Sequence, residues 1–246
     1  MNIYHITYSP TARVVCLHFW GCNLSCKACL LKREIYDCHL AETKDRIFRG
    51  QNVANQTPDS FLELEGVMQY LRKLDIQQVV FMGAEPALDP ELPELTEALH
   101  REFSSYNILL TNGFQLTDLT NIDEVVFSIK AYTDSLHRHF TGASNKKALE
   151  NLVKLYKSGV KLRTESIFIP EYIDEPEIEN IARFIAGVDA SIPYRIDAYI
   201  PIGDNPWRRS TPGEIKNAAS LASKYLRNVS YLTGTEDLKY EVARVY

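Results

Sequence analysis

The chain has 246 residues, a formal net charge of −5 at pH 7 and a sequence pI near 5.7. This acidic balance argues against a general nucleic-acid-binding protein, which would carry an excess or a patch of basic residues. No apolar run reaches the roughly 18–20 residues that a membrane-spanning helix needs. Free cysteines and the absence of an N-terminal hydrophobic signal segment predict a protein of the reducing cytoplasm.

Short apolar runs alternate with amphipathic segments along most of the chain, and we interpret the runs as buried strands. Alternating strands and helices imply parallel pairing with right-handed crossovers. We therefore predict an α/β fold, a partial (β/α)6 TIM-like barrel, in a single domain over residues 1–246. Its core spans about 13–200, and a C-terminal helix and extension occupy 211–246. The predicted strands are Arg13–Phe19, Gln78–Met82, Asn107–Thr111, Glu124–Ile129, Val160–Ile169 and Tyr194–Ile200.

Capping signals predict where several helices begin and end. Asp89-Pro90-Glu91 is typical of a helix start, and Thr211-Pro212-Gly213-Glu214 is typical of a capping box. A helix over Asp174–Ala186 is expected to stop at Gly187. The polar stretch Lys44–Pro58 lacks periodicity, so we interpret it as a surface loop.

Charged and polar residues interrupt three neighbouring predicted strands. Because strand side chains alternate between faces, Arg163 and Glu165 share one face, and so do Arg195, Asp197 and Tyr199. Ser128 and Lys130 share a face at the end of their strand. Buried charges are costly unless they are paired or face a wet cavity. These rows indicate a barrel lumen with chemistry at the carboxyl ends of its strands, with structural ion pairs as the alternative.

Cys22, Cys26 and Cys29 form a C-x3-C-x2-C run directly after the first predicted strand. Three thiolates from one loop can hold an iron–sulfur cluster by three corners, which leaves one iron open to a substrate or co-substrate. Of the other two cysteines, Cys16 lies in an apolar strand and is expected to fill the core. Only Cys38 then remains, so the sequence offers no ligand set for a second cluster.

Three other interpretations of the cysteine run stay open at this point. Cys38 or His39 could complete a four-ligand zinc site in a non-enzymatic protein. Disulfides are disfavoured because the cysteine count is odd. The spacing i, i+4, i+7 also fits one buried helix face. Gly21, Asn23 and Ser25 weaken a helix there, because such residues favour turns and caps.

The cysteine run and a second motif resemble the radical S-adenosylmethionine (SAM) superfamily. In that family the three cysteines hold a [4Fe–4S] cluster whose open iron binds SAM. Gly83-Ala84-Glu85-Pro86 follows the second predicted strand and resembles a Gly-Gly-Glu-Pro segment that contacts the SAM amino group. Small residues suit such a segment because the backbone must approach the ligand closely.

Longer stretches resemble the activating enzymes of glycyl-radical enzymes, of the pyruvate formate-lyase activase type, over about residues 13–200. The resemblance implies hydrogen abstraction from a glycine of a partner glycyl-radical enzyme, with a small-molecule substrate as the alternative, and a reducing donor such as ferredoxin or flavodoxin. The matching stretches are Phe19-Trp20-Gly21-Cys22, Thr111-Asn112-Gly113-Phe114, Ile129-Lys130, Asp134-x2-His137 and Thr141-Gly142-Ala143-Ser144-Asn145.

The resemblance also assigns roles to single residues. It implies Cys22, Cys26 and Cys29 as cluster ligands. From the polar rows on the predicted strands we expect Lys130, Glu165 and Asp197 to be catalytic residues. The positions expected to bind SAM are Gly83, Ala84, Glu85, Asn112, Ser128, Lys130 and Arg163. The chain departs from the activase pattern at positions expected to face SAM or substrate, namely Ala28, Leu30-Leu31, Leu110, Ser128, Glu165 and Ala198-Tyr199-Ile200.

Overall fold

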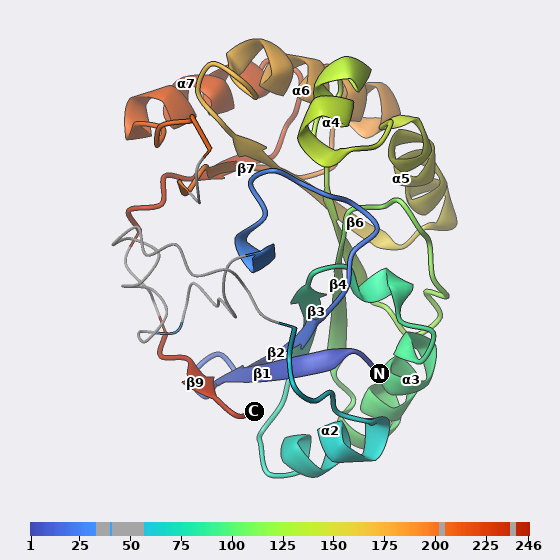
Figure 1. Cartoon of the computed structure of the whole chain (residues 1–246). Coiled ribbons are helices and arrows are strands. Elements are labelled where there is room, and N and C mark those ends of the chain that lie inside the picture. The colour runs from blue at the N-terminus through green and yellow to red at the C-terminus, as the bar shows by residue number, and fades with distance from the viewer. Residues whose placement is uncertain (33–39, 41–56, 202–204, 237–239) are drawn as a thin grey trace.

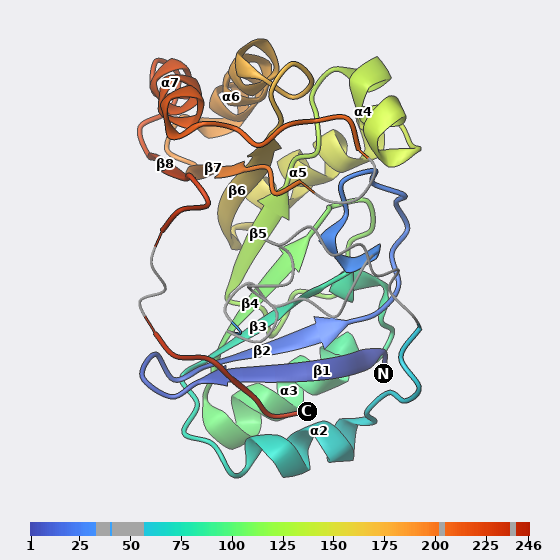
Figure 2. The same cartoon turned by 60° about the vertical axis from the view of Figure 1, so that its left-hand side comes forward.

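A computed structural model describes residues 1–32, 40, 57–201, 205–236 and 240–246. Its centre is one sheet in the order β8-β7-β6-β5-β4-β3-β2-β1-β9 (Figures 1 and 2). Neighbouring strands from β2 to β8 are parallel, whereas β1 and β9 are antiparallel additions at one edge. Because β8 and β9 are the two ends of this order and do not pair with each other in the described residues, the sheet is an open partial barrel, as predicted. The strands are β1 (Ile3–Ser9), β2 (Val14–Phe19), β3 (Gln78–Gly83), β4 (Tyr106–Thr111), β5 (Glu124–Ser128), β6 (Lys161–Phe168), β7 (Tyr194–Ala198), β8 (Val229–Leu232) and β9 (Ala243–Arg244).

The helices cover the convex face of the curved sheet, and the segment that carries the cysteines lies toward its concave side (Figures 1 and 2). Most connections from the carboxyl end of one strand to the amino end of the next pass through these helices, whereas β4 leads to β5 through residues 112–123 without a helix. The helices are α2 (Leu64–Leu71), α3 (Leu92–Phe103), α4 (Asp134–Thr141), α5 (Lys146–Ser158), α6 (Glu175–Asp189) and α7 (Pro212–Ala222), with short 3-10 turns η1 (Leu30–Lys32) and η2 (Pro86–Leu88).

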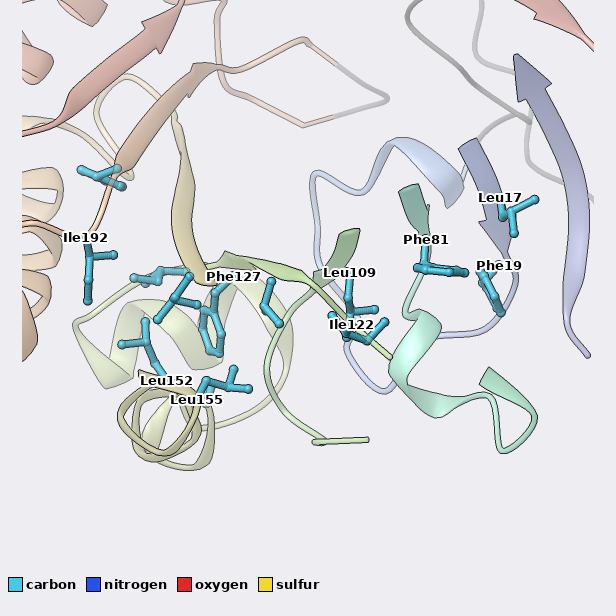
Figure 3. Close-up of a cluster of buried hydrophobic side chains, with 14 of the residues drawn as sticks. Leu17, Phe19, Phe81, Leu109, Ile122, Phe127, Leu152, Leu155 and Ile192 are labelled. Carbon is cyan, nitrogen blue, oxygen red and sulfur yellow. The ribbon is translucent and has the colours of Figure 1, made fainter. Parts of the chain in front are cut away.

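The hydrophobic core lies between the convex face of the sheet and the helices (Figure 3). Alternate strand residues such as Phe19, Phe81 and Phe127 are fully buried there, beside Leu152 and Leu155 of α5. Each such side chain contributes about 1.5–3 kcal/mol relative to an exposed one. The intervening strand residues face the concave side, so that face is available for polar chemistry.

The six predicted strands are confirmed within a few residues, and the capping box of Thr211 and Glu214 is present. Two predicted helix boundaries are wrong. The Asp89 carboxylate accepts the amides of Asn2 and Glu91, but α3 begins at Leu92 with Glu91 as its N-cap. Helix α6 continues through Gly187 to Asp189.

The structure corrects the expectation for Cys16 and does not describe most of the residues of two other expectations. Cys16 is half-buried in β2, between the fully buried Val15 and Leu17, and is therefore not part of the convex core. Cys38, His39 and nearly all of the loop predicted at 44–58 lie outside the described residues. Among the described helices, none is long and apolar enough to cross a membrane.

Candidate functional site

The cysteine loop starts where β2 ends, and the next strand holds it in place. Gly21 adopts φ +92°, a left-handed conformation that favours glycine and turns the chain out of the strand. The Ala84 amide donates to the Phe19 carbonyl at 2.9 Å, and the Glu85 amide donates to the Gly21 carbonyl at 3.0 Å. The predicted SAM-binding segment after β3 therefore lies directly beside the start of the cysteine loop.

Gly83 makes this close approach possible. Its φ is +102°, and a Cβ atom there would lie 2.6 Å from the Phe19 backbone nitrogen. A side chain would thus collide with main-chain atoms that cannot move independently. Glycine at this position is a steric requirement of the contact between β2 and β3.

The far part of the cysteine loop is attached to the end of α4. The amides of Ser25 and Lys27 donate to the carbonyls of Thr141 and Phe140 at 2.8 and 2.9 Å. The last carbonyls of a helix have no partner within the helix, so they are free to accept such bonds. Cys26 lies between the two anchored amides and is held by α4.

The three cysteines lie on a partly open surface. Cys22 is exposed, whereas Cys26 and Cys29 are half-buried. The Cys22 sulfur accepts hydrogen bonds from the Leu24 amide at 3.4 Å and from Asn112 Nδ2 at 3.6 Å. Within the described ranges, no three His, Cys, Asp or Glu side chains are grouped as ligands of a single metal ion. Three thiols on one anchored loop nevertheless fit the donor chemistry of an iron–sulfur cluster.

Glu85 is a buried, hydrogen-bonded carboxylate beside this loop. Its carboxylate is 1% exposed and accepts the Thr111 hydroxyl at 2.6 Å, the Asn112 amide at 2.7 Å and the Ala87 amide at 3.3 Å. Burial raises the pKa of Glu85, while these hydrogen bonds and the charge of Lys130 act in the opposite direction. Glu85 thereby joins the ends of β3 and β4, and Asn112 extends the connection to Cys22.

Ser128, Glu165 and Arg195 are cross-strand neighbours on β5, β6 and β7. The Ser128 hydroxyl donates to Glu165 at 2.6 Å, and Arg195 Nη2 donates to the other Glu165 oxygen at 2.7 Å. Arg195 also binds Asp197 through two bonds of 2.8 and 2.9 Å. We call Ser128, Glu165, Arg195 and Asp197 the polar row. It occupies the concave side of the three strands.

The environment of Asp197 favours its protonated form. Burial raises the pKa of Asp197 to about 6; the charges of Glu165 and Glu236 act in the same direction, and the Arg195 guanidinium opposes them. Because 31% of the side chain stays accessible, water on the concave side weakens the effect of burial.

Arg163 does not join the other predicted SAM-binding residues. Its guanidinium pairs with Glu124 at the first position of β5, where Glu124 also binds Lys161 and the Tyr106 hydroxyl. Glu124 is only 3% exposed, so these partners compensate a buried carboxylate. The pair lies near the amino ends of β5 and β6, whereas the cysteine loop follows the carboxyl end of β2. Its contacts favour a structural role for Arg163.

An aromatic cluster that the sequence did not indicate adjoins the cysteine loop. Tyr172 stacks on Trp207 with ring centroids 4.4 Å apart. Phe140 makes edge contacts with both of these rings, and Tyr199 makes one with Trp207. Tyr199, which was expected to line the lumen, is fully buried in this cluster. The four residues come from separate segments, so no local pattern could have revealed them.

The geometry therefore places a cysteine loop and a buried acidic residue at the carboxyl ends of β2 and β3, and a polar row across β5, β6 and β7 on the concave side. A family model described as the radical SAM superfamily matches residues 17–185. The chain belongs to the radical SAM superfamily. Such an enzyme uses a [4Fe–4S] cluster and SAM, which reductive cleavage converts to methionine and a 5′-deoxyadenosyl radical that abstracts hydrogen.

Two kinds of relative agree with this assignment. A Methanocaldococcus jannaschii protein, named as a candidate glycyl-radical enzyme activating enzyme, is 30% identical over 94% of this chain and 84% of its own. A radical SAM methyltransferase of Sphaerobacter thermophilus shares the fold with a TM-score of 0.64 at 15% identity, over 89% of this chain and 65% of that one. Streptococcus suis SuiB bound to SAM gives a TM-score of 0.58 at 14% identity over 86% of this chain. This chain spans 45% of SuiB and just under two thirds of the methyltransferase.

Proposed function

We propose that this radical SAM enzyme abstracts hydrogen from a glycine of a partner protein and so activates a glycyl-radical enzyme. The observation that carries the proposal is the match to the M. jannaschii relative over nearly the whole chain. The stretches that resemble activases belong to the site, since Asn112 reaches Cys22 and Thr141 holds the cysteine loop.

In this proposal Cys22, Cys26 and Cys29 hold the cluster. Gly83, Ala84 and Glu85 lie next to the loop and orient the methionine part of SAM, and Asn112 and Ser128 bind its polar groups. Lys130 follows β5 two residues after Ser128, and its charge acts on Glu85. On this basis we assign it to the SAM carboxylate. Glu165 and Asp197 face the substrate.

A small-molecule substrate is the second candidate, and the polar row favours it. Glu165, Arg195 and Asp197 place two carboxyl groups and a guanidinium group side by side on the concave face. A glycine in a peptide carries no charge that would use them. A charged small molecule would exchange hydrogen bonds with this row and gain orientation from it.

The test is anaerobic reconstitution with iron and sulfide, followed by reduction with SAM and chromatography for 5′-deoxyadenosine. We expect product from the wild type and none from Cys26→Ala, which lacks one cluster ligand. Electron paramagnetic resonance with a candidate partner protein then distinguishes the substrates, because a stable glycyl radical gives its own signal. A zinc-rich, colourless protein without 5′-deoxyadenosine formation would reject the proposal.

A further inference from the structure

The two ends of the sheet leave different lengths of strand edge open. At one end β9 has only two residues, Ala243–Arg244, and one of them is charged. At the other end β8, Val229–Leu232, pairs only with β7 within the described residues (Figure 2). Proteins protect an edge strand with charged residues, proline or a bulge, because its unpaired backbone can bind another strand. The β8 sequence Val-Ser-Tyr-Leu has no charged residue or proline, and its register with β7 is uninterrupted.

The outer side of β8 carries unpaired backbone groups. In the ladder with β7, the Tyr194 amide donates to the Asn228 carbonyl at 2.9 Å, and Tyr194 lies opposite Val229. Since alternate residues of a parallel strand bond to alternate neighbours, Val229 and Tyr231 direct their N–H and C=O groups away from β7. No residue of the described ranges pairs with these groups, and Tyr231 is 40% exposed. An extended segment can therefore bind here through main-chain hydrogen bonds.

Alternate side chains of β8 continue the surface that carries the polar row. In the register with β7, Ser230 lies beside Arg195 and Leu232 lies beside Asp197. Neighbours in register share a face of the sheet, so Ser230 and Leu232 lie on the concave side, and both are exposed. A strand added to β8 would lie about 4.8 Å from it and would place every second side chain on this side. The concave side is where the proposed function puts the substrate.

Carboxylates are in excess around the carboxyl end of β8. The chain turns at Gly234, and Glu236 accepts the amides of Thr233 and Gly234 at 2.5 and 2.9 Å. This turn brings Glu236 close enough for its charge to act on Asp197. Among the described residues, the charged groups that meet here are those of Glu165, Arg195, Asp197, Glu236 and Arg209, which lies beside Gly234. Three carboxylates against two guanidinium groups leave a negative balance at neutral pH, which favours a basic side chain in a bound segment.

We infer that the outer edge of β8 is the docking site of an extended, basic segment of the partner protein, which adds to the sheet as a further strand. This inference rests on the proposed function, because it assumes that the substrate is part of a protein. The main chain of the segment pairs with Val229 and Tyr231, and its basic side chains lie on the concave side near Asp197 and Glu236. Since β2 to β8 are parallel, the bound segment leads to the carboxyl ends of the strands, where the cysteine loop begins.

The first experiment compares Tyr231→Pro with Tyr231→Thr. Proline removes the outward N–H of residue 231 without removing a bond between β8 and β7, whereas threonine removes the same aromatic ring and keeps the N–H. All proteins are reconstituted and compared by thermal melting and iron content. Formation of 5′-deoxyadenosine with dithionite and SAM, in the absence of any peptide, should be the same in the wild type and in both variants.

The probe is the peptide Ac-Thr-Val-Lys-Val-Gly-Val-Lys-Val-Thr-NH2 with dideuterated glycine, which places both lysines and the glycine on one face of a strand. Its control carries glutamate in place of both lysines. We expect the lysine peptide to protect the amides of β8 from hydrogen exchange, measured by mass spectrometry. Tyr231→Pro should weaken binding of this peptide at least about tenfold, because main-chain bonds are lost, whereas Tyr231→Thr should stay within about threefold of the wild type. The glutamate peptide should bind the wild type at least about tenfold more weakly.

Equal peptide affinity of Tyr231→Pro and Tyr231→Thr would overturn the inference, and so would equal affinity for the two peptides or an unprotected β8. A wild type that is dimeric in light scattering and becomes monomeric in Tyr231→Pro would overturn it too, since the edge would then bind a second copy. Deuterium transfer from the peptide to 5′-deoxyadenosine without protection of β8 would reject the docking site and leave the proposed function intact. Protection of β8 without such transfer in any protein would support the docking site and contradict glycine as the substrate.

Discussion

The Ser25 amide donates a hydrogen bond to the Thr141 carbonyl at 2.8 Å, although the two residues are far apart in sequence. This bond and its neighbour from Lys27 to Phe140 make the last turn of α4 the support of Cys26. The helix end is in turn closed by His137, whose Nδ1 lies 2.6 Å from the Ala143 carbonyl oxygen and 3.0 Å from the Thr141 hydroxyl. The Asp134-x2-His137 stretch thus stabilises the helix end to which the cysteine loop is hydrogen-bonded.

Replacing His137 should loosen the cysteine loop. His137 is 2% exposed, so His137→Leu keeps the apolar packing but leaves the Ala143 carbonyl without this partner. We expect a loss of about 1–3 kcal/mol in the free energy of unfolding and a lower iron content after reconstitution. Urea unfolding and iron analysis measure both. His100→Leu, which removes only a partly exposed pair with Asp123, is the control and should retain iron. Unchanged iron content in His137→Leu would show that the cysteine loop does not depend on the bonds of His137 at the end of α4.

Two glycines should respond to alanine in opposite directions. In Gly83→Ala the new Cβ would meet the Phe19 backbone at 2.6 Å, at a φ of +102° that alanine rarely adopts. We expect severe destabilisation or failure to fold. Gly187 lies inside α6, where an added Cβ would meet nothing within 4 Å. Gly187→Ala should therefore stabilise the protein by about 0.5–1 kcal/mol. Thermal and urea unfolding measure both, and a stable Gly83→Ala protein would contradict the close approach of β2 and β3.

Glu165→Gln tests the polar row. The amide oxygen of the new side chain could still accept the Ser128 hydroxyl, and Arg195 would keep its two bonds to Asp197, so the fold should tolerate the change. We expect substrate turnover to fall while SAM cleavage without substrate continues. Chromatography of 5′-deoxyadenosine with and without substrate measures the two rates.

Glu179→Gln is the matched control for this experiment, because Glu179 also pairs with an arginine but lies on α6. It should leave both rates unchanged. If Glu165→Gln lowered both rates together, Glu165 would belong to the SAM site and not to the substrate site.

The strands were predictable because buried parallel strands are continuous apolar runs bounded by turns. Strand β1 was missed, since its pairing with β2 is irregular between Ile3 and His5 and disturbs the alternation. The end of α6 was predicted wrongly at Gly187, because glycine ends a helix only where the backbone turns left-handed, and α6 stays helical there.

The sequence could not distinguish Arg163 from Glu165, since both occupy one face of β6. Strand register separates them, because it sets Glu165 beside Ser128 and Arg195 while the Arg163 guanidinium pairs with Glu124.

Asp197 should make the stability of the metal-free protein depend on pH. Its pKa of about 6 in the folded protein exceeds the ordinary value near 3.8, so the folded state binds more protons between these values. The contribution of Asp197 to stability therefore falls as pH rises through this window. Relative to Asp197→Asn, which cannot titrate, the wild type should lose about 1–2 kcal/mol between about pH 4 and pH 7. Without solvent, the difference between the two pKa values would correspond to a change of nearly 3 kcal/mol in the free energy of unfolding. The water that reaches Asp197 reduces this change.

Urea unfolding at several pH values measures this difference between wild type and variant. Asp189→Asn is the control, because hydrogen bonds from Ser191 and Tyr156 lower the pKa of Asp189. For Asp189 the pH dependence is opposite to that of Asp197. Its ionised carboxylate stabilises the fold above its ordinary pKa, so the stability of the wild type relative to Asp189→Asn falls as the pH falls. Parallel curves for wild type and Asp197→Asn would mean that water on the concave side solvates Asp197 as well as bulk water does.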